Sequence, residues 1–401
     1  MKTRRDFITI AAASVAGTTV TAGRASPGRR KATPQRVVVM MFDGFGPEYF
    51  DRSSMPTLRR WQRDGFYKQV EGVMPSVTNA NNASICCGVF PRDHGITGNS
   101  YLDTRTNREE YMESADLLLA PTLFERAAGV GVRGALLSSK KKTISLLSRG
   151  ASFAVTAEEP PPEWIESVGP TAPIYSREIN YWLMRAAIHV LKSRPDIGCL
   201  YVHTTDYPMH TWAPDTPESR EHLEKMDALI GAASDAAPDA AFLLTADHGM
   251  NHKRKCYDLV RVLAHAGLPI RASISAERDR YVKHHRGFGG AAWVYLEKAA
   301  DRDAVLAALA KLPGVESVLT RDETVTRYLQ YGPRIGDLCV FGDEHTVFGD
   351  LEEPESELPE TYRSHGSSHE LAIPLFAYNA KGLPEERYFK HNLDLARWLY
   401  R

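Results

Sequence analysis

The sequence has few cysteines and no long apolar segment after its first thirty residues. Its 401 residues include five cysteines, none in the CxxC spacing of metal and redox motifs, and an odd number cannot all pair. We therefore predict that the cysteines are small buried apolar residues, and whether two of them form a disulfide is left open. No stretch after residue 30 is long enough for a membrane-spanning helix, which needs roughly 20 apolar residues.

An excess of one charge sign is also missing. Lys and Arg number 49, Asp and Glu number 50, and the formal net charge is −1. Nothing in this balance favours a nucleic-acid polymer or an acidic membrane surface as a partner. The sequence contains no internal repeat and no heptad run. With 43% apolar and 25% charged residues, the composition is that of a soluble globular protein of one or two domains.

The first thirty residues predict an export signal rather than part of the fold. Lys2, Arg4 and Arg5 give a positive start with the twin-arginine pattern, an apolar segment runs from Ile8 to Val20, and small residues surround Ala22. The apolar segment is too short to span a bilayer, so no stable membrane anchor is expected. The pattern predicts recognition by the twin-arginine export machinery and a periplasmic or secreted protein; a disordered tail is the alternative.

Short apolar segments, each next to polar or turn residues, predict the strands of a buried parallel sheet. Such runs of Val, Leu and Ile are typical of strands covered on both faces, and they lie at Arg36–Phe42, Val132–Leu137, Ile197–His203, Ala241–Leu244 and Leu371–Tyr378. Helical patterns lie between them, at Met55–Asp64, Pro121–Ala128, Glu178–Ser193, Pro217–Ala233 and Leu259–Ala266. This alternation predicts an α/β layered fold with a mostly parallel sheet and ligands at the carboxyl ends of its strands.

Residues 280–345 have a different pattern. Ala291–Leu296, Gly314–Thr320 and Gly336–Phe341 are typical of strands, and Ala300–Leu312 is typical of a helix. We expect a small α+β cap at 280–345, inserted into a catalytic domain of residues 31–279 and 346–401, with residues 1–30 as signal peptide and linker.

Acids and histidines gather at the ends of the predicted strands. They are Asp43, Asp206, His210, Asp247, His248 and His365. Each alone is weak, because an Asp before Gly is commonly a turn residue, an Asp–His pair is commonly on the surface, and a lone loop histidine indicates nothing. Together they form a mixed oxygen and nitrogen set that zinc or a similar divalent ion accepts. Two such ions suit phosphoryl chemistry, since one activates the nucleophile and the other stabilises the leaving atom.

Thr78 is the predicted nucleophile. The segment Met74–Ile85 passes from a proline-led approach into a helical pattern. Thr78 would lie near the helix N-terminus, where free N–H groups and the helix dipole favour a bound phosphoryl anion. Metal coordination would ease loss of the hydroxyl proton, which an unassisted threonine needs before it can attack. A threonine that only caps the helix is the alternative.

The chain resembles the alkaline phosphatase superfamily, in its nucleotide pyrophosphatase and phosphonoacetate hydrolase branches, over the nucleophile segment PSVTNANNASICCGVFPRDHGITGNSYLD. The TNANN form is more similar to the phosphonoacetate hydrolases. Further segments resemble those hydrolases in the same order, namely TTDYPMHTWAP, TADHGMNHK, YVKHHRGFGGAAWVYL, RIGDL and RSHG. The resemblance covers nearly the whole chain after the signal and implies a sheet of alkaline phosphatase type.

The resemblance implies a role for each residue that matches a motif of the family. One divalent ion would be held by Asp43, Thr78, Asp247 and His248. The other would be held by Asp206, His210 and His365, with His369 as the fallback for the last. Asn99 matches an asparagine that steadies a phosphoryl oxygen; a loop asparagine capping a turn is the alternative.

Lys140 and Lys142 carry the prediction of the substrate. The segment Ser139–Lys142 resembles the family's AKDK segment, whose two lysines meet the phosphonate and the carboxylate of phosphonoacetate. A solvated basic run is the alternative. Ser139 and Lys141 depart from the family pattern, SSHE differs after His365, and export is unusual for an enzyme that feeds on an imported phosphonate.

The sequence therefore predicts a hydrolase with two divalent ions, zinc being the first choice, that cleaves the C–P bond of phosphonoacetate to acetate and phosphate. One alternative is a phosphodiesterase or nucleotide pyrophosphatase with a larger, more apolar leaving-group pocket. The other is a periplasmic metal- or phosphonate-binding protein, which would need no Thr78. The expected partner is a small phosphorus-containing substrate, and a homodimer is left open.

Overall fold

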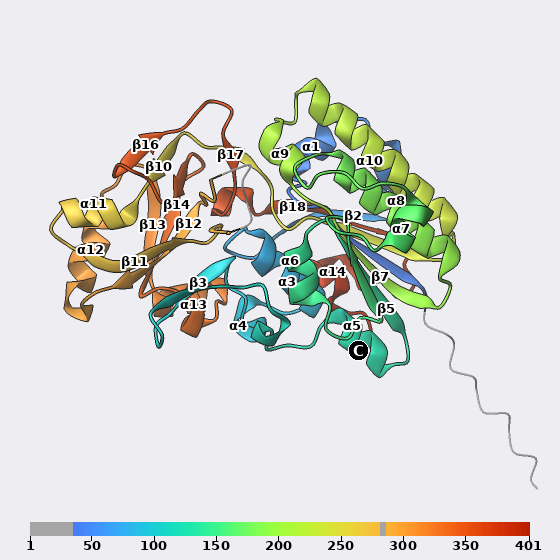
Figure 1. Ribbon diagram of the computed structural model, residues 1–401, viewed down its shortest axis with the longest axis horizontal. Helices are drawn as coiled ribbons and strands as arrows, with labels where there is room; N and C mark the ends of the chain where they lie inside the picture. The colour runs from blue at the N-terminus through green and yellow to red at the C-terminus, as the bar shows by residue number, and fades with distance from the viewer. Residues whose placement is uncertain (1–34, 281–285) are drawn as a thin grey trace, which may run out of the picture. The chain divides into compact units, whose positions relative to one another are not determined.

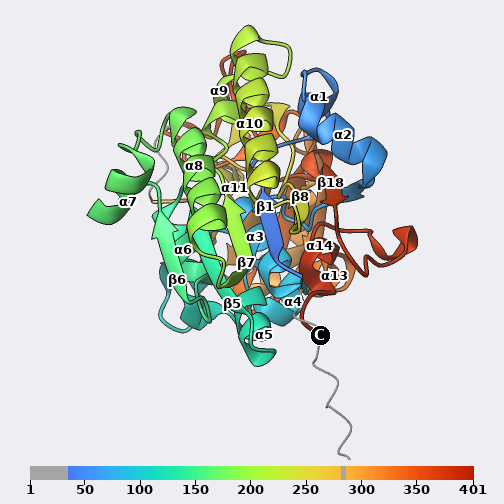
Figure 2. The same ribbon diagram turned by 90° about the vertical axis from the view of Figure 1, so that its right-hand side faces the viewer.

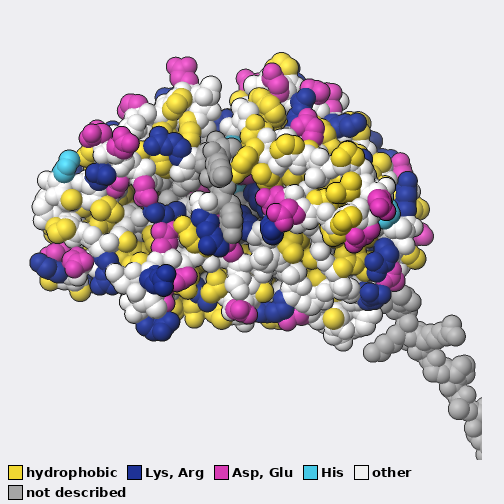
Figure 3. Space-filling view, in the orientation of Figure 1, with side chains coloured by type: hydrophobic (Ala, Val, Ile, Leu, Met, Phe, Trp, Pro, Cys, Tyr) yellow, Lys and Arg dark blue, Asp and Glu magenta, His cyan; other side chains and the backbone are white. Residues whose placement is uncertain are grey.

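The computed structural model describes residues 35–280 and 286–401 (Figure 1). The export signal and part of the YVKHHRG segment lie outside the described residues. Within the described residues, no helix combines the length and the apolar character that crossing a membrane requires. On the face shown in Figure 3, Lys and Arg side chains are interspersed with Asp and Glu, in keeping with the balanced composition.

A seven-stranded sheet forms the centre, in the order β2-β18-β8-β1-β7-β5-β6. Its strands are β1 (Val37–Met41), β2 (Phe66–Glu71), β5 (Arg133–Ser138), β6 (Phe153–Thr156), β7 (Ile197–His203), β8 (Ala241–Thr245) and β18 (Ala372–Tyr378). β1 and β8 are buried along their whole length, as their continuous apolar sequences predict. From β8 to β6 all neighbours are parallel, whereas β18 is antiparallel to both β8 and β2. The predicted mostly parallel α/β fold is confirmed.

Helices cover both faces of this sheet (Figures 1 and 2). On one face lie α2 (Pro56–Asp64), α8 (Glu178–Ser193) and α10 (Pro217–Ala236), and α10 packs against both of the others. The other face carries α3 (Thr78–Cys87), α5 (Leu123–Gly129), α6 (Lys141–Leu147) and α14 (Asp394–Arg397). All five cysteines are buried and free, so the prediction of small buried residues is confirmed.

A second, four-stranded antiparallel sheet has the order β11-β12-β14-β13. Its strands are β11 (Ile270–Ser275), β12 (Ala291–Leu296), β13 (Val315–Thr320) and β14 (Leu338–Gly342), and its helices are α11 (Leu259–His265), α12 (Arg302–Leu309) and α13 (Arg321–Tyr328). The three strands predicted here are confirmed. β11, however, precedes residue 280, where the cap was expected to begin. Its sequence IRASIS has too few apolar residues to indicate a strand, and pairing with the buried β12 makes it one.

The remaining elements are short. They are α1 (Pro47–Asp51), α4 (Pro91–His94), α7 (Pro162–Val168), α9 (Tyr207–Thr211), β3 (Ser100–Asp103), β4 (Arg108–Tyr111), β9 (Asn251–His252), β10 (Lys255–Tyr257), β15 (Thr346–Phe348), β16 (Glu355–Glu357) and β17 (Arg363–Ser364).

Candidate active site

The carboxyl edge of the central sheet collects the predicted acids and histidines. β1, β7 and β8 are parallel neighbours, so Asp43, Asp206 and Asp247, which follow these strands, arrive at one edge. β18 runs the other way, so the residues before it, His365 among them, reach the same edge. β2 also ends there and leads into the loop before Thr78.

The seven predicted metal-site residues are all buried, and none is more than 7% exposed. They are Asp43, Thr78, Asp206, His210, Asp247, His248 and His365. The topology therefore brings every one of them into the interior at this edge.

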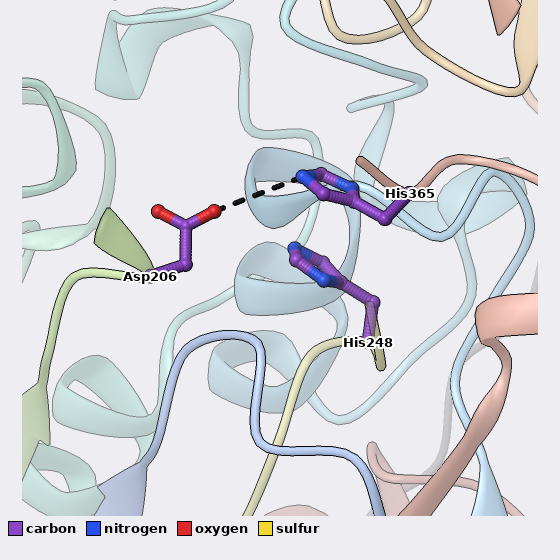
Figure 4. A group of neighbouring side chains, drawn as sticks. All are labelled: Asp206, His248 and His365. Atoms are coloured by element: carbon purple, nitrogen blue, oxygen red, sulfur yellow. Dashed lines mark ion pairs between the residues drawn. The ribbon is translucent and has the colours of Figure 1, made fainter. Parts of the chain in front are cut away.

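Two overlapping groups of side chains lie close enough together to hold an ion each. The first is Asp206, His248 and His365, and the second is Asp43, Asp247 and His248; within each group the candidate ligand atoms lie within 4.8 Å of one another. Asp206 Oδ2 lies 3.7 Å from His365 Nε2, and the rings of His248 and His365 stack with centroids 3.5 Å apart (Figure 4). Because the groups share His248, they are adjacent, as the two ions of a dinuclear centre must be.

The three histidines are held in the tautomer that a metal ligand needs. Nδ1 of His210, His248 and His365 donates to a backbone carbonyl in each case, at 2.8, 2.9 and 2.8 Å. A carbonyl can only accept, so the proton is on Nδ1 and the lone pair is on Nε2. For His210, Nε2 lies 2.9 Å from Asp206 Oδ2, which brings this histidine to the first group.

In two of the acids, only one of the two carboxylate oxygens accepts hydrogen bonds. Asp43 Oδ2 accepts from Lys140 Nζ at 2.6 Å and lies 3.2 Å from His203 Nε2. Asp247 Oδ1 accepts the backbone N–H groups of Gly44 at 3.0 Å and of His248 at 2.9 Å. Each carboxylate is thereby oriented with its second oxygen toward the cluster.

The atoms left over indicate a cation. Among the described residues, Asp43 Oδ1, Asp247 Oδ2 and His365 Nε2 are buried and have no hydrogen-bond partner. A buried polar atom in that condition costs about 1–3 kcal/mol. A divalent ion bound to these atoms would remove the cost, and carboxylate and imidazole are ligands that zinc accepts. The residues therefore fit the expected metal.

The pKa values of the acids reflect uneven charge compensation. Burial and the nearby Asp206 would raise the pKa of Asp43, but Lys140 and His203 outweigh them and hold it below its usual range. Burial would also raise the pKa of Asp206, and Lys140 and His210 hold it well below. Burial and Asp43 raise the pKa of Asp247 well above its ordinary value. Positive charge is thus in deficit beside Asp247.

The lysine segment divides between the interior and the surface. Lys140 Nζ bridges Asp43 and Asp206, at 2.6 and 3.0 Å, and Lys142 forms an ion pair with Asp279, whose side chain is 1% exposed. Lys141 instead pairs with Glu159 at the surface. The alternative interpretation, a basic run exposed to solvent, therefore holds for Lys141 only.

A cavity of about 530 Å³ opens on this site. Lys140, Lys142 and Asp206 line it on the side of the metal cluster, and Ile174 and Tyr175 supply apolar wall. The predicted substrate lysines and a predicted metal ligand therefore face one shared space.

Thr78 is the first residue of α3, as predicted, and Val77 occupies the N-cap, so the alternative of a capping threonine is wrong. Thr78 Oγ1 lies 3.5 Å from His248 Nε2. The loop before it is held by Asn81, which accepts from Val73 N at 2.7 Å and donates to three backbone carbonyls of the same loop. Local hydrogen bonding therefore determines where the hydroxyl lies.

Two further residues singled out in the sequence, Asn99 and His369, lie in different surroundings. Asn99 is buried, and its amide donates across the chain to the backbone oxygen of Glu277 at 3.3 Å, which is not a local turn cap. His369 lies apart from the cluster, with its side chain 35% exposed and paired with Glu316 at 2.9 Å. The structure places His365, and not His369, beside Asp206.

Two residues of the site were not predicted. His203 is the last residue of β7 and is fully buried beside Asp43. Its position at the end of a predicted strand is the sequence feature that could have identified it as a site residue. Glu277 lies with Oε1 3.8 Å from His365 Nε2, and burial raises its pKa well above the ordinary value. It follows β11, which the sequence did not indicate, so no local pattern marked it.

Comparisons with known proteins show a matching family and similar solved structures. The family described as type I phosphodiesterase / nucleotide pyrophosphatase matches residues 37–368. A phosphonoacetate hydrolase from Sinorhizobium meliloti, solved in complex with phosphonoacetate, is 30% identical, with a TM-score of 0.81 over 91% of this chain and 95% of that chain. Human ectonucleotide pyrophosphatase / phosphodiesterase 5 is 17% identical, with a TM-score of 0.67 over 90% and 93%, and indicates the fold alone.

The curated relatives are longer than the matched region. A bis(5'-adenosyl)-triphosphatase of Bos taurus is 24% identical over 236 residues, which are 56% of this chain and 49% of that protein. The chain thus spans about half the length of the curated relatives it matches.

Proposed function

Since the chain belongs to the type I phosphodiesterase and nucleotide pyrophosphatase family of the alkaline phosphatase superfamily, and is a phosphoester or phosphonate hydrolase of that type, we propose that Thr78 is its nucleophile and that two divalent ions are its cofactors. The observation that carries the proposal is the set of buried ligand atoms without a hydrogen-bond partner among the described residues, namely Asp43 Oδ1, Asp247 Oδ2 and His365 Nε2.

The division of ligands follows the two groups of side chains. Asp43, Thr78, Asp247 and His248 would hold one ion, and Asp206, His210 and His365 the other. When bound, the ions supply the positive charge that favours the Thr78 alkoxide and neutralises the phosphoryl group and the leaving atom. Zinc is the first choice for this mixture of imidazole and carboxylate.

The chain's own groups then perform the transfer. Thr78 Oγ1 attacks phosphorus opposite the leaving group, so that its bond to phosphorus forms as the P–C or P–O bond breaks. With phosphonoacetate, the departing carbon keeps the electron pair and takes a proton from water to give acetate. Water next attacks the phosphothreonine, which releases phosphate and restores the hydroxyl. Backbone N–H groups at the start of α3 and the amide of Asn99 stabilise the phosphoryl oxygens.

Phosphonoacetate is the substrate that we propose first. Support comes from the solved relatives, which hold phosphonoacetate or phosphonoformate and are 30% identical over nearly the whole chain. It comes also from Lys140 and Lys142, whose side chains are 13% and 7% exposed and line the cavity beside Asp206. Their positive charge would meet the carboxylate and stabilise the enolate that develops as the P–C bond breaks.

A phosphodiester or a nucleotide is the second candidate, and the cavity favours it. Its volume of about 530 Å³ exceeds what an acetate group fills, and Ile174 and Tyr175 offer apolar wall. A binding protein without catalysis is the third candidate, and a buried threonine hydroxyl 3.5 Å from a candidate ligand nitrogen argues against it.

The test is a substrate panel on zinc-reconstituted protein, with phosphonoacetate, a nitrophenyl phosphodiester and a nucleoside triphosphate. Thr78→Val keeps the shape of the side chain and should lower every activity at least about a thousandfold, whereas Thr78→Ser keeps the hydroxyl and should retain part of it. Unchanged activity in Thr78→Val would refute the nucleophile. Metal-loaded wild type that cleaves no member of the panel would favour the binding protein.

A further inference from the structure

We infer that His203 and Ser138 are positioning residues that orient Asp43, so that one oxygen of this carboxylate is reserved for a metal ion. The inference rests on the metal site of the proposed function and assigns a role to two residues that neither ligate metal nor contact substrate. The juxtaposition behind it is a chain of hydrogen bonds across the ends of three adjacent strands.

The sheet register places these residues side by side. Ser138 is the last residue of β5 and pairs with His203, the last residue of β7, which pairs in turn with Met41 at the end of β1. Asp43 lies two residues after the end of β1. Ser138, His203 and Asp43 are each 0% exposed, so their hydrogen bonds are made within the protein.

The direction of each hydrogen bond follows from the groups available. The backbone N–H of Lys140 donates to Ser138 Oγ at 3.0 Å, which leaves the serine proton for His203 Nδ1, also at 3.0 Å. His203 therefore carries its proton on Nε2 and donates it to Asp43 Oδ2 at 3.2 Å. The other tautomer would set a nitrogen lone pair against a carboxylate oxygen.

The consequence for Asp43 is that both donors reach the same oxygen. Oδ2 accepts from His203 and from Lys140 Nζ, the latter at 2.6 Å. Oδ1 lies 3.6 Å from His248 Nε2 and has no hydrogen-bond partner among the described residues. A carboxylate held in this way presents one oxygen to a cation without first having to rotate, and such supporting contacts typically change metal affinity 10–100-fold when removed.

The same contacts tie the metal ligand to the lysine segment. Ser138 holds the backbone of Lys140, which is the N-cap of α6, while the Lys140 side chain returns to Asp43. The hydrogen bonds therefore close a ring through Asp43, His203, Ser138 and Lys140. Substitution of His203 or Ser138 should therefore disturb both the orientation of the Asp43 carboxylate and the start of α6, the helix that carries Lys142.

A pair of substitutions at His203 separates hydrogen bonding from packing. His203→Phe keeps a planar ring and removes both nitrogens, whereas His203→Gln loses the ring and keeps a donor for Asp43 and an acceptor for Ser138. Chelator-stripped proteins are titrated with Zn²⁺ in competition with a fluorescent chelator. We expect His203→Phe to weaken zinc affinity at least about tenfold and His203→Gln to stay within about threefold of wild type.

Two further variants keep the test decisive. Ser138→Ala removes a small group and should also weaken zinc affinity, by a smaller factor, in a protein whose circular dichroism matches wild type. His94→Phe is the matched control, because His94 is likewise fully buried and lies 2.8 Å from a serine hydroxyl, that of Ser84, away from the cluster. It should leave zinc affinity unchanged.

The outcomes distinguish this inference from the proposed function. If His203→Phe binds zinc like wild type, or if His203→Gln is the weaker binder of the two, the positioning role is overturned while the metal site stands. If wild type binds no zinc, the metal site is refuted and the positioning role with it.

Discussion

Individual atoms decide how the acids of this site can act. Asp43 and Asp247 each have one oxygen that accepts two hydrogen bonds and one that, among the described residues, accepts none. The imidazoles beside them carry their protons on Nδ1, so the free lone pairs point toward the same space. A carboxylate with two bare oxygens would be free to rotate, and this arrangement removes that freedom before any ligand arrives.

His365 and His369 provide a matched pair for the metal assignment. We expect His365→Ala to lower metal content from about two ions per chain toward one, since its Nε2 faces Asp206. His369→Ala should leave the content unchanged, because that side chain pairs with Glu316 at the surface. Elemental analysis after gel filtration measures both, and a loss confined to His369→Ala would reverse the assignment.

Lys141 and Lys142 provide a matched pair for the substrate. Lys142→Ala should lower kcat/KM for phosphonoacetate more than tenfold, because loss of a buried charge partner costs about 2–5 kcal/mol and about 1.4 kcal/mol is already tenfold. It should spare a phosphodiester without a carboxylate. Lys141→Ala is the control, since that side chain lies at the surface with Glu159. Lys140→Ala should impair both substrates, since Lys140 touches two candidate metal ligands. Equal effects of Lys141→Ala and Lys142→Ala would refute the substrate role.

Among the secondary-structure elements, the loop before α3 and the loop before β18 are joined by direct hydrogen bonds. Ser76 Oγ donates to Ser367 O at 2.7 Å and accepts from Gly366 N at 3.0 Å, while the Ser76 carbonyl takes the Nδ1 proton of His365. The nucleophile and a candidate ligand are therefore held by shared backbone contacts, although they come from opposite ends of the chain.

The link between α3 and α4 should make stability depend on pH. His94 accepts from Ile96 N at 3.1 Å and bonds Ser84 Oγ at 2.8 Å, and burial lowers the pKa of His94 from 6.5 to about 3. Between these values the unfolded chain binds a proton that the folded protein does not. Stability should thus fall as pH falls from 6.5 toward 3, by at most about 1.4 kcal/mol per pH unit for this group.

Urea unfolding of chelator-stripped protein across this range measures the effect. His94→Gln keeps a donor and an acceptor but cannot titrate here, so its stability should change less steeply with pH. His222, also buried with a pKa lowered to about 3, should leave a residual slope in that variant. Identical slopes for wild type and His94→Gln would contradict the prediction.

In the molecule as a whole, six strands of the seven-stranded sheet and loops next to the four-stranded sheet contribute residues to the site. Ser364 Oγ donates to Phe288 O at 2.6 Å, and Gly290 N donates to His365 O at 2.8 Å, so residues next to the four-stranded sheet hold the loop of a candidate ligand. Binding of ions at such a junction should stabilise the fold as a whole.

Metal removal should therefore lower the melting temperature. An ion that binds only the folded state stabilises it by about 2.7 kcal/mol at a hundredfold excess over its Kd. We expect zinc to raise the Tm of stripped wild type and to have a smaller effect on Asp247→Asn, in which one of the two sites is weakened. A Tm that zinc leaves unchanged in both would speak against a structural metal centre.

Export concerns the chain before the described fold. We propose the twin-arginine route on the strength of Arg4 and Arg5 ahead of a short apolar segment. Replacing both arginines with lysine should leave unprocessed protein in the cytoplasm in a cell-fractionation experiment. Undiminished periplasmic protein would refute the route without bearing on the enzyme class.

The buried strands, the helices between them and the chemical types at the strand ends could all be predicted from local patterns of residues. β1, β7 and β8 were predicted because continuous apolar runs are a local signal. Asp43, Asp206 and Asp247 follow from the same signal, since parallel strands end at one edge. Thr78 was placed at a helix start by its proline-led approach, and only the capping alternative was wrong.

Which of these groups lie in contact depends on the pairing of segments that are far apart in the sequence. The antiparallel direction of β18 brings His365 to the cluster, and no property of its seven residues indicates a direction. β11 is a strand only through its partner, so Glu277 after it had no signal. His203 and Ser138 became significant through a sheet register that joins residues 65 positions apart. Contacts of this kind depend on long-range pairing, which a local pattern of residue types does not contain.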